Sequence, residues 1–307
     1  MTRASKFLFA AVATLALPAS TAFAQGDLDG AVEEGAEGDA SAEESADSSA
    51  PADGISTTTP APAGAWSRSV VDRPVTLPTG KLGAGAQLQI ARASLGPLGS
   101  ATATGLGIVG GYGINDKLSV GGSYSFTLDE FEIKGPLSIY GAYTLVDNGK
   151  LTIGASADVV FNFNGSDGMG GSSTDTTIHA GLAARYKIAP QLAVFTGSPW
   201  TPGPLGQHLS LGLNEGAPKT FSIPVGVGFQ ATPELFAFAN TTLATIMLSD
   251  PGMGDRVSFI GDLIPLTIGA FYSVTPNIDA VVAFDMPDVP SVGDLFAVTV
   301  GARYFTN

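Results

Sequence analysis

The sequence contains one pairing of a candidate nucleophile with a candidate base. It is formed by Ser210 and His208, with Leu209 between them. Residues two apart on a strand point to the same side, as a serine activated by a histidine requires. The leucines at 209, 211 and 213 take the opposite side, so His208 and Ser210 belong to a polar face. A site that cleaves lipid from an apolar outer surface would need the reverse parity. We therefore predict no enzymatic activity and interpret the two residues as a polar pair.

A second set of residues that could do chemistry is charged or titratable and shares the polar parity of its segments. Its members are Asp158, His179, Arg185, Lys187, Asp279, Asp285 and Arg303. Such residues can form a charged constriction that selects solutes. They can equally pair with one another across a wall, and the sequence leaves both readings open. No metal or cofactor is predicted: the chain has no cysteine, and its loop aspartates follow no calcium-loop spacing.

Alternation of apolar and polar residues with a period of two marks the segments that carry these side chains. Between 118 and 128 the even positions are mainly large and apolar, and the odd positions between 117 and 127 are small or polar. Most such segments have about ten residues, enough for a tilted strand to cross a bilayer. We predict twelve strands: 81–92, 104–114, 117–128, 136–146, 150–164, 175–188, 191–198, 220–231, 234–248, 263–274, 277–287 and 294–305.

Five short turns alternate with longer connections rich in Gly, Ser, Asp and Pro. The turns are 114–118, 146–151, 188–192, 231–235 and 274–278. Short turns at one end and long loops at the other predict an all-β, up-and-down antiparallel transmembrane barrel. A propeller blade would need four short strands per repeat, and a soluble lipocalin-like barrel could not fill a twelve-stranded interior. Segment 197–220 is ambiguous: it is either a strand extension or an extra pair that gives fourteen strands.

Composition agrees with a strand-built membrane protein. The chain has 307 residues, of which 44% are hydrophobic and 14% charged. Beyond the N-terminal leader it has no uninterrupted apolar run of about 18 residues, which disfavours membrane-spanning helices. The net charge of -14 and the lack of a basic cluster exclude nucleic acid as a partner.

The first 80 residues divide into three parts. Residues 1–24 have a basic start, an apolar stretch and an Ala-x-Ala end, which predicts a cleaved signal peptide. Residues 25–65 hold ten acidic residues, no basic one and almost no large apolar side chain, which predicts a disordered tail. Residues 66–80 are expected to be a linker to the barrel at 81–307. An even strand count places the termini, and so the tail, on the periplasmic side.

The pattern of strands and turns resembles the outer-membrane β-barrel proteins of Gram-negative bacteria, porins and transporters among them. The last strand resembles their C-terminal assembly signal, through Phe296, Val298, Val300, Ala302 and Tyr304. The resemblance implies the outer membrane as location, its lipid as surroundings and the barrel-assembly machinery as partner. The family norm ends on an aromatic residue, whereas this chain ends on Thr306 and Asn307.

Two narrower resemblances concern function. A Gly-rich wall of twelve strands is similar to transporters for aromatic or apolar compounds. The His208 and Ser210 pair is similar to an outer-membrane phospholipase with a His-x-Ser-plus-Asn site. The Asn of that family lies well downstream, but here the nearest one is Asn214, on the same strand and beyond orienting reach.

The sequence thus favours a passive channel or facilitator for small solutes. An alternative is a structural or interaction barrel whose lumen is closed by segment 197–220, with Trp200 as the plug, or by the tail. A phospholipase-like hydrolase is the remote alternative.

Overall fold

The computed structural model describes most of the chain beyond residue 65. The described ranges are 66–94, 99–128, 136–164, 173–196, 207–213, 219–249, 257–259 and 264–306. The signal peptide and acidic tail predicted over 1–65 lie outside these ranges. Within them, no helix is long and apolar enough to cross a bilayer.

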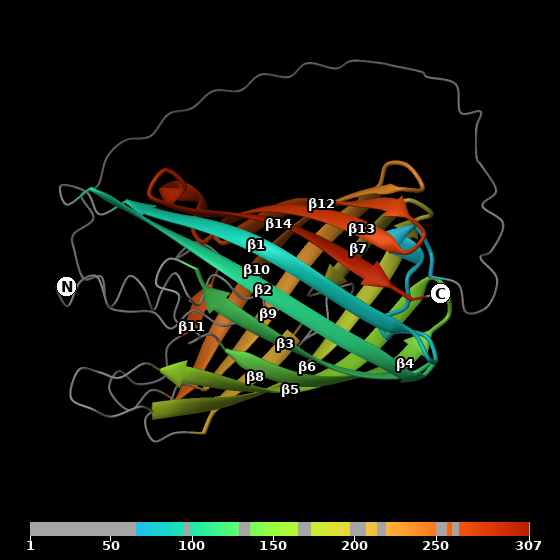
Figure 1. Cartoon of the computed structure of the whole chain (residues 1–307), viewed down its shortest axis with the longest axis horizontal. Helices are drawn as coiled ribbons and strands as arrows, with labels where there is room; N and C mark the ends of the chain where they lie inside the picture. The colour runs from blue at the N-terminus through green and yellow to red at the C-terminus, as the bar shows by residue number, and fades with distance from the viewer. Residues whose placement is uncertain are drawn as a thin grey trace, which may run out of the picture.

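The described strands form one antiparallel sheet that closes on itself (Figure 1). The first and last strands pair from Gly83 with Phe305 to Ala93 with Leu295, which completes the closure. The strands are β1 (Leu82–Ser94), β2 (Ser100–Asn115), β3 (Leu118–Thr127), β4 (Leu137–Asp147), β5 (Leu151–Asn164), β6 (Ser173–Ala189), β7 (Leu192–Thr196), β8 (Gln207–Gly212), β9 (Lys219–Gln230), β10 (Leu235–Ser249), β11 (Val257–Phe259), β12 (Leu266–Thr275), β13 (Ile278–Met286) and β14 (Leu295–Phe305).

These fourteen strands fill twelve positions around the barrel, so the predicted twelve-stranded fold is confirmed. Both β7 and β8 pair with β6 on one side and β9 on the other. The ambiguous segment therefore supplies a second piece of the same strand position rather than an extra pair. Likewise β11 and β12 lie along successive parts of β10.

The wall is interrupted where β7 gives way to β8. Thr196 is opposite Ala184 on β6, whereas Gln207 is opposite Leu182, two residues further along. Pro224 on β9 faces this interruption, where its missing N–H leaves no ladder bond unmade. The Thr196 hydroxyl donates to the Pro224 carbonyl at 2.8 Å instead. Residues 197–206, with the proposed plug Trp200, lie outside the described ranges.

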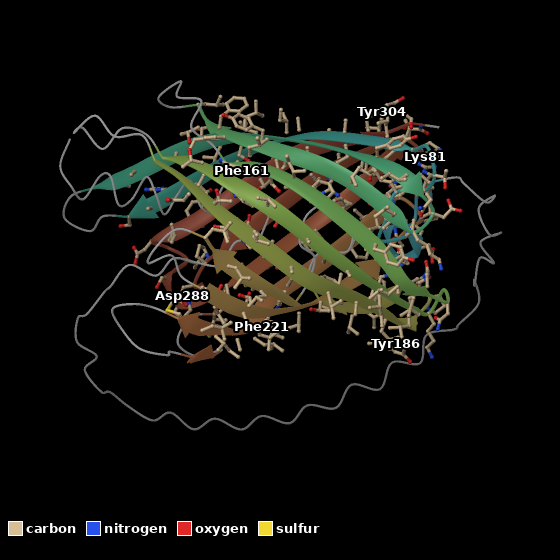
Figure 2. The ribbon with its side chains drawn as sticks, turned by 90° about the horizontal axis from the view of Figure 1, so that it is seen from below. Lys81, Phe161, Tyr186, Phe221, Asp288 and Tyr304 are labelled. Atoms are coloured by element: carbon tan, nitrogen blue, oxygen red, sulfur yellow. The ribbon has the colours of Figure 1, made fainter. Side chains whose placement is uncertain are left out.

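The outer face of the barrel is apolar. Large side chains exposed there recur at every second residue, such as Ile139, Tyr143, Ile268 and Tyr272. An exposed apolar girdle of this kind is stable only against lipid, because exposing so large an apolar surface to water is unfavourable. Figure 2 shows Lys81, Tyr186 and Tyr304 at the end of the barrel that carries the tight turns, and Asp288 toward the opposite end.

The inner face is built of small residues and a few large ones. On β3 and β4 the buried positions include Ser119, Ser125, Ser138 and Tyr140. A side chain at Gly121 would come within 2.2 Å of the Tyr140 hydroxyl, so glycine is required where that ring lies against the wall. The hydroxyl donates across the wall to the Gly110 carbonyl at 3.1 Å.

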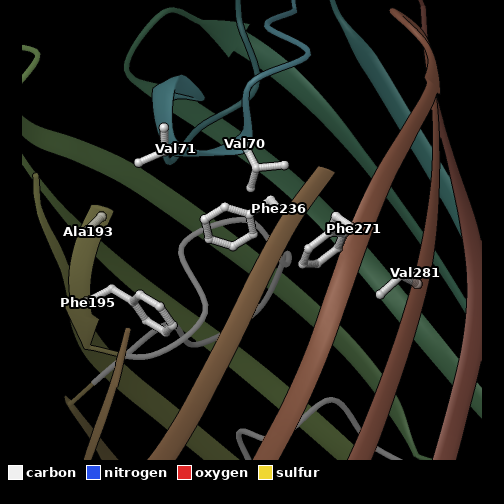
Figure 3. Packing of buried hydrophobic residues seen from close by; sticks show 7 residues of the cluster. All are labelled: Val70, Val71, Ala193, Phe195, Phe236, Phe271 and Val281. Atoms are coloured by element: carbon white, nitrogen blue, oxygen red, sulfur yellow. The ribbon is translucent and has the colours of Figure 1, made fainter. Parts of the chain in front are cut away.

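Residues 66–80, which sequence reasoning treats as a linker, run inside the tight-turn end of the barrel (Figures 1 and 3). We call them the inner segment. They contain a single short 3-10 turn, η1 (Val70–Asp72), and lead directly into β1. A second such turn, η3 (Val289–Ser291), lies between β13 and β14.

The orientation of β14 gives a stability test. Val300 is 55% exposed at the middle of the strand, and Tyr304 is 50% exposed near its tight-turn end. We expect Val300→Arg to lower the free energy of unfolding by about 2–4 kcal/mol, because it places a cation at the bilayer midplane. Tyr304→Arg, near the interface, should cost about 0–1 kcal/mol. Urea titration in lipid vesicles measures both, and equal costs would contradict this depth assignment.

Candidate functional site: the lumen and its inner segment

The apolar part of the inner segment fills the centre of the tight-turn end. Val70 and Val71 are fully buried and belong to one cluster with side chains of four strands (Figure 3). The cluster's strand residues are Ala193, Phe195, Phe236, Phe271 and Val281. All five side chains point into the lumen, where they form an apolar patch at this end of the barrel. The patch is stable there because the inner segment covers it. Burying two valines contributes a few kcal/mol.

Arg73 is the main polar anchor of the inner segment. Its guanidinium makes a bidentate ion pair with the Asp279 carboxylate on β13, with Nη2 to Oδ1 at 2.8 Å. Both side chains are 2% exposed. The Ser273 hydroxyl accepts from Arg73 at 3.0 Å and donates to Asp279 at 2.8 Å. The group is therefore a buried, hydrogen-bonded ion pair, the arrangement in which removal of one partner is strongly destabilising.

Aromatic rings complete the surroundings of Arg73. Trp66 stacks on Phe305 with ring centroids 4.5 Å apart. The Arg73 guanidinium lies 5.2 Å from the Trp66 ring centroid and 5.8 Å from that of Phe305. Cation–π contacts with desolvated rings add to the ion pair. Residues of the inner segment and of the last strand are thus packed around the same cation.

Three further polar contacts attach the segment to β6, to β9 and to the turn between β9 and β10. Asp72 pairs with Lys187 at 2.5 Å, and Arg68 pairs with Glu234 at 3.3 Å. The backbone N–H of Val71 donates to the Gln230 side chain at 3.2 Å. These contacts surround the apolar cluster and hold η1 in one orientation.

The second half of the inner segment is attached to β4 and to the turn between β2 and β3. The Thr76 and Thr144 hydroxyls are 2.9 Å apart in a buried contact. Thr79 donates from its hydroxyl at 2.6 Å and from its N–H at 3.2 Å to the Asp116 carboxylate. The hydroxyl donation first, and the N–H donation second, lower the pKa of Asp116, because both favour the charged carboxylate.

Glycines in the wall make room for this half of the segment. A Cβ at Gly113 would lie 2.0 Å from the Pro78 carbonyl oxygen, and one at Gly154 would lie 2.7 Å from a Val75 methyl group. Backbone hydrogen bonds join the same place, from Gly80 to Gly113 at 2.8 Å and from Gly113 to Lys81 at 2.9 Å. The inner segment therefore approaches the wall as closely as another strand would.

The seven charged or titratable residues predicted for the lumen lie on the inner face, and several of them have partners outside this set. The Asp158 carboxylate accepts from Ser138 at 3.1 Å and contacts His179 Nδ1 at 2.7 Å. Asp285 accepts from the hydroxyl of Thr267 at 2.7 Å. Asp279 and Lys187 instead have partners on the inner segment.

The two wall arginines have different surroundings. Arg185 donates to Thr152 at 3.1 Å, while its Nε and Nη1 are buried and have no protein partner. Arg303 lies directly opposite Asp279 across β13 and β14, and its guanidinium is 4.8 Å from the Phe271 ring centroid. Arg303 also lines a small hollow on the inner wall, together with Gln87, Ser123 and Ser125.

His208 and Ser210 lie two residues apart on β8 and face different residues of β6. Ser210 is opposite His179 on β6, and His208 is opposite Gly181. Because Asp158 holds Nδ1 of His179, the second ring nitrogen of His179 is the one left to other contacts. The histidine opposite Ser210 across the wall is thus His179. Asn214 lies outside the described ranges.

The residues of the predicted assembly signal all lie on β14, at alternate positions facing outward. Val300 and Tyr304 of this set are exposed, and Ala302 pairs with Ala86 across the closing seam. Over the part of the chain that is described, no three His, Cys, Asp or Glu side chains gather to hold a metal ion.

Arg73 and its neighbours are the site residues that sequence reasoning missed. One signal was available. After a tail of small and acidic residues, Trp66, Arg68, Val70, Val71 and Arg73 bring large apolar and basic side chains back into the chain before the first strand begins. Their partners lie far away in sequence: Arg73 and Asp279, for example, are 206 residues apart.

Comparisons with known proteins give only distant structural resemblances. No family model and no curated protein sequence matches the chain. Solved structures that resemble it include the KdgM porin, with 8% identity, a TM-score of 0.47 and coverage of 72% of this chain and 98% of that one. The NanC porin has 9% identity, a TM-score of 0.46 and coverage of 71% and 98%. An outer membrane channel from Pseudomonas putida F1 has 10% identity, a TM-score of 0.46 and coverage of 75% and 97%.

Gly113 provides a test of the close approach of the inner segment. We expect Gly113→Ala to displace residues 77 and 78, because its methyl group would overlap the Pro78 carbonyl. Trypsin cleavage at Arg68 and Arg73 should then become about tenfold faster while the barrel stays folded. Gly141→Ala is the matched control, since a Cβ there meets nothing within 4 Å. Equal cleavage rates in both variants would contradict the placement.

The contact between Thr79 and Asp116 gives a pH prediction. A carboxyl group with a lowered pKa stabilises the folded contact above its usual value of about 3.9, and loses that contribution as the pH falls through the lowered value. We expect Trp66 emission, measured with Trp200→Phe, to shift to the red as the pH falls below about 4. Asp116→Asn should show a smaller shift over the same range, because other carboxylates still titrate there. Identical titrations would argue against this attachment.

Proposed function

We propose that this protein is an outer-membrane channel for small solutes whose periplasmic mouth is closed by its own inner segment. The observation that carries the proposal is the attachment of residues 66–80 inside the tight-turn end, through η1 and the ion pair of Arg73 with Asp279. The segment is continuous with β1 and occupies the interior of a closed barrel. Passage through that end therefore requires the segment to move.

The chemistry of the attachment supports reversible closure. Arg73, Asp72 and Arg68 form ion pairs with strand residues, and replacing a buried ion pair by apolar groups is often neutral or stabilising. These ion pairs hold the inner segment in one orientation. When the segment moves, the separated charged groups can be hydrated in a water-filled lumen. A permanently closed structural barrel is the competing function, and conduction separates the two.

The wall above the inner segment suits small neutral or weakly polar solutes. The hollow beside Gln87 is bordered by Gly85, Gly107, Ser123 and Ser125, with Arg303 as its charged group. Lipid around the outer girdle and the barrel-assembly machinery at β14 are the partners that the architecture fits.

A cysteine pair tests the closure directly, since the chain has no cysteine of its own. We combine Thr76→Cys with Thr144→Cys, because their hydroxyls are 2.9 Å apart. In planar bilayers the oxidised variant should show about tenfold lower open time than the reduced one. Deleting residues 66–80 should raise the conductance.

Thr76→Cys alone is the matched control and should not respond to oxidant. A barrel that stays silent after reduction, after deletion of 66–80 and with Gly113→Ala would overturn the channel proposal in favour of a structural barrel.

The second candidate function is a hydrolase in the wall. It is favoured by one observation, the position of Ser210 directly opposite His179, whose Nδ1 is held by Asp158. A fluorophosphonate probe should label Ser210 if the three act as nucleophile, base and orienting group. Labelling that is absent, or that persists with Ser210→Ala, dismisses this function.

A further inference from the structure

Asp285 is a carboxylate of the inner wall that has no basic partner among the residues that the structure describes. The other two acidic residues predicted for the lumen each have one: Asp279 pairs with Arg73, and Asp158 contacts the His179 ring. Asp285 lies further along β13 than Asp279, toward the long loops. Its contacts in the described part of the chain are hydrogen bonds from two threonine hydroxyls.

These hydroxyls hold the carboxylate in place from both sides. The Thr267 hydroxyl, on β12, donates to Oδ1 of Asp285 at 2.7 Å, and the Thr299 hydroxyl, on β14, donates to Oδ2 at 3.5 Å. Gln89 of β1 donates from Nε2 to the Thr299 oxygen at 3.3 Å, which leaves the Thr299 proton for Asp285. One hydrogen-bonded row thus crosses the inner wall through Gln89, Thr299, Asp285 and Thr267. The row fixes the position of the carboxylate without neutralising its charge.

The carboxylate can be reached from the lumen. Asp285 and Thr267 are only partly buried, whereas Thr299 is 8% and Gln89 is 6% exposed. Ala283, the neighbouring position on the same side of β13, is also partly exposed. Each oxygen of a carboxylate can accept two hydrogen bonds, and the threonines take one on each. Both oxygens therefore keep acceptor capacity for a solute.

The charges of the long connections are a second, independent reason to expect a cation here. The connection 128–136 has three acidic residues and one basic residue, and 250–263 has the same numbers. They join β3 to β4 and β10 to β12, at the end of the barrel toward which Asp285 lies. Acidic residues at the mouth of a passage with low-dielectric walls raise the local concentration of cations.

A purely structural role for Asp285 would not require a charge. An amide oxygen at this position could accept the Thr267 hydroxyl equally well, whereas a carboxylate largely removed from water and without a cation is costly. A cation beside Asp285 offsets this cost. Asp279 differs, because its charge is already balanced by Arg73 within the protein.

We propose that Asp285, held by Thr267 and Thr299, is a subsite of the lumen that binds small cations, including solutes with a primary ammonium group. The two carboxylate oxygens and the Thr267 oxygen can accept the three N–H groups of an ammonium. This inference rests on the proposed function, because it names the class of small solute that the channel favours.

Charge-selective labelling tests the subsite without conduction. Ala283→Cys places a thiol two residues from Asp285, in a chain that has no other cysteine. The probes are two methanethiosulfonates of similar size, one with a trimethylammonium group and one with a sulfonate. We expect Asp285→Asn to lower the ratio of the cationic to the anionic labelling rate about tenfold, because the nearby negative charge is lost.

Two control variants in the Ala283→Cys background make the result specific. Asp285→Glu keeps the charge and should keep most of the preference for the cationic probe. Asp147→Asn removes a negative charge from the exposed tight turn after β4 and should label with the parent ratio. Heat-dependent mobility on gels verifies that every variant is folded.

Conduction then tests the choice of solute. In planar bilayers with a KCl gradient, the reversal potential should show a lower preference for K⁺ over Cl⁻ in Asp285→Asn than in the parent, and an unchanged preference in Asp285→Glu. A reversal potential that Asp285→Asn leaves unchanged overturns the role of Asp285 in this choice.

The outcomes separate the two proposals. A labelling ratio that is the same with and without Asp285→Asn overturns the cation subsite. An equal loss of the ratio in Asp285→Asn and Asp285→Glu also overturns it, because charge is then not the cause. If the ratio falls in Asp285→Asn and is kept in Asp285→Glu, but no variant conducts, the subsite stands and the channel function fails.

Discussion

Backbone hydrogen bonding in lipid is the constraint on which the rest of this structure depends. No water is available in the hydrocarbon to satisfy an open strand edge, so a sheet that spans it must close. Pairing of β1 with β14 achieves this closure. The alternation of apolar and polar residues along each strand then follows, because a closed wall has one face toward lipid and one toward the lumen. The interruption between β7 and β8 is tolerated because β6 and β9 remain paired with one piece or the other along most of their length.

Closure creates the second problem, an interior that twelve strand positions cannot fill with their own small side chains. The tight-turn end solves it with residues 66–80, whose valines cover Phe236 and Phe271. The segment also brings Asp72 and Arg73 to Lys187 and Asp279. Two of the lumen charges, Asp279 and Lys187, therefore pair with a segment that precedes the barrel, whereas Asp158 and His179 pair with each other across the wall. This links the folding of residues 66–80 to the packing of the barrel interior.

The strands were predictable because their signal is local. Strand β5 was expected at 150–164 and is found at Leu151–Asn164, since period-two alternation is written in consecutive residues. The short strand β11 was missed because three residues carry too little alternation, and β8 lies in the segment 197–220 that the sequence left ambiguous. The same period-two alternation predicts that Asp158, Arg185 and Arg303 point into the lumen. It does not predict their partners, because Ser138, Thr152 and Phe271 are defined by register between strands and by side-chain reach.

The sequence by itself determined the closed barrel, the face of each strand residue and the two unlike ends, all of which depend on local spacing and on the absence of water in lipid. Only the tertiary structure decided that residues 66–80 lie inside the barrel and that Asp279 faces two arginines. The physical reason is that a contact between Arg73 and Asp279 joins positions 206 apart. Nothing in the spacing of either segment encodes such a contact; it arises when closure brings β13 and β14 around a segment that is short enough to enter.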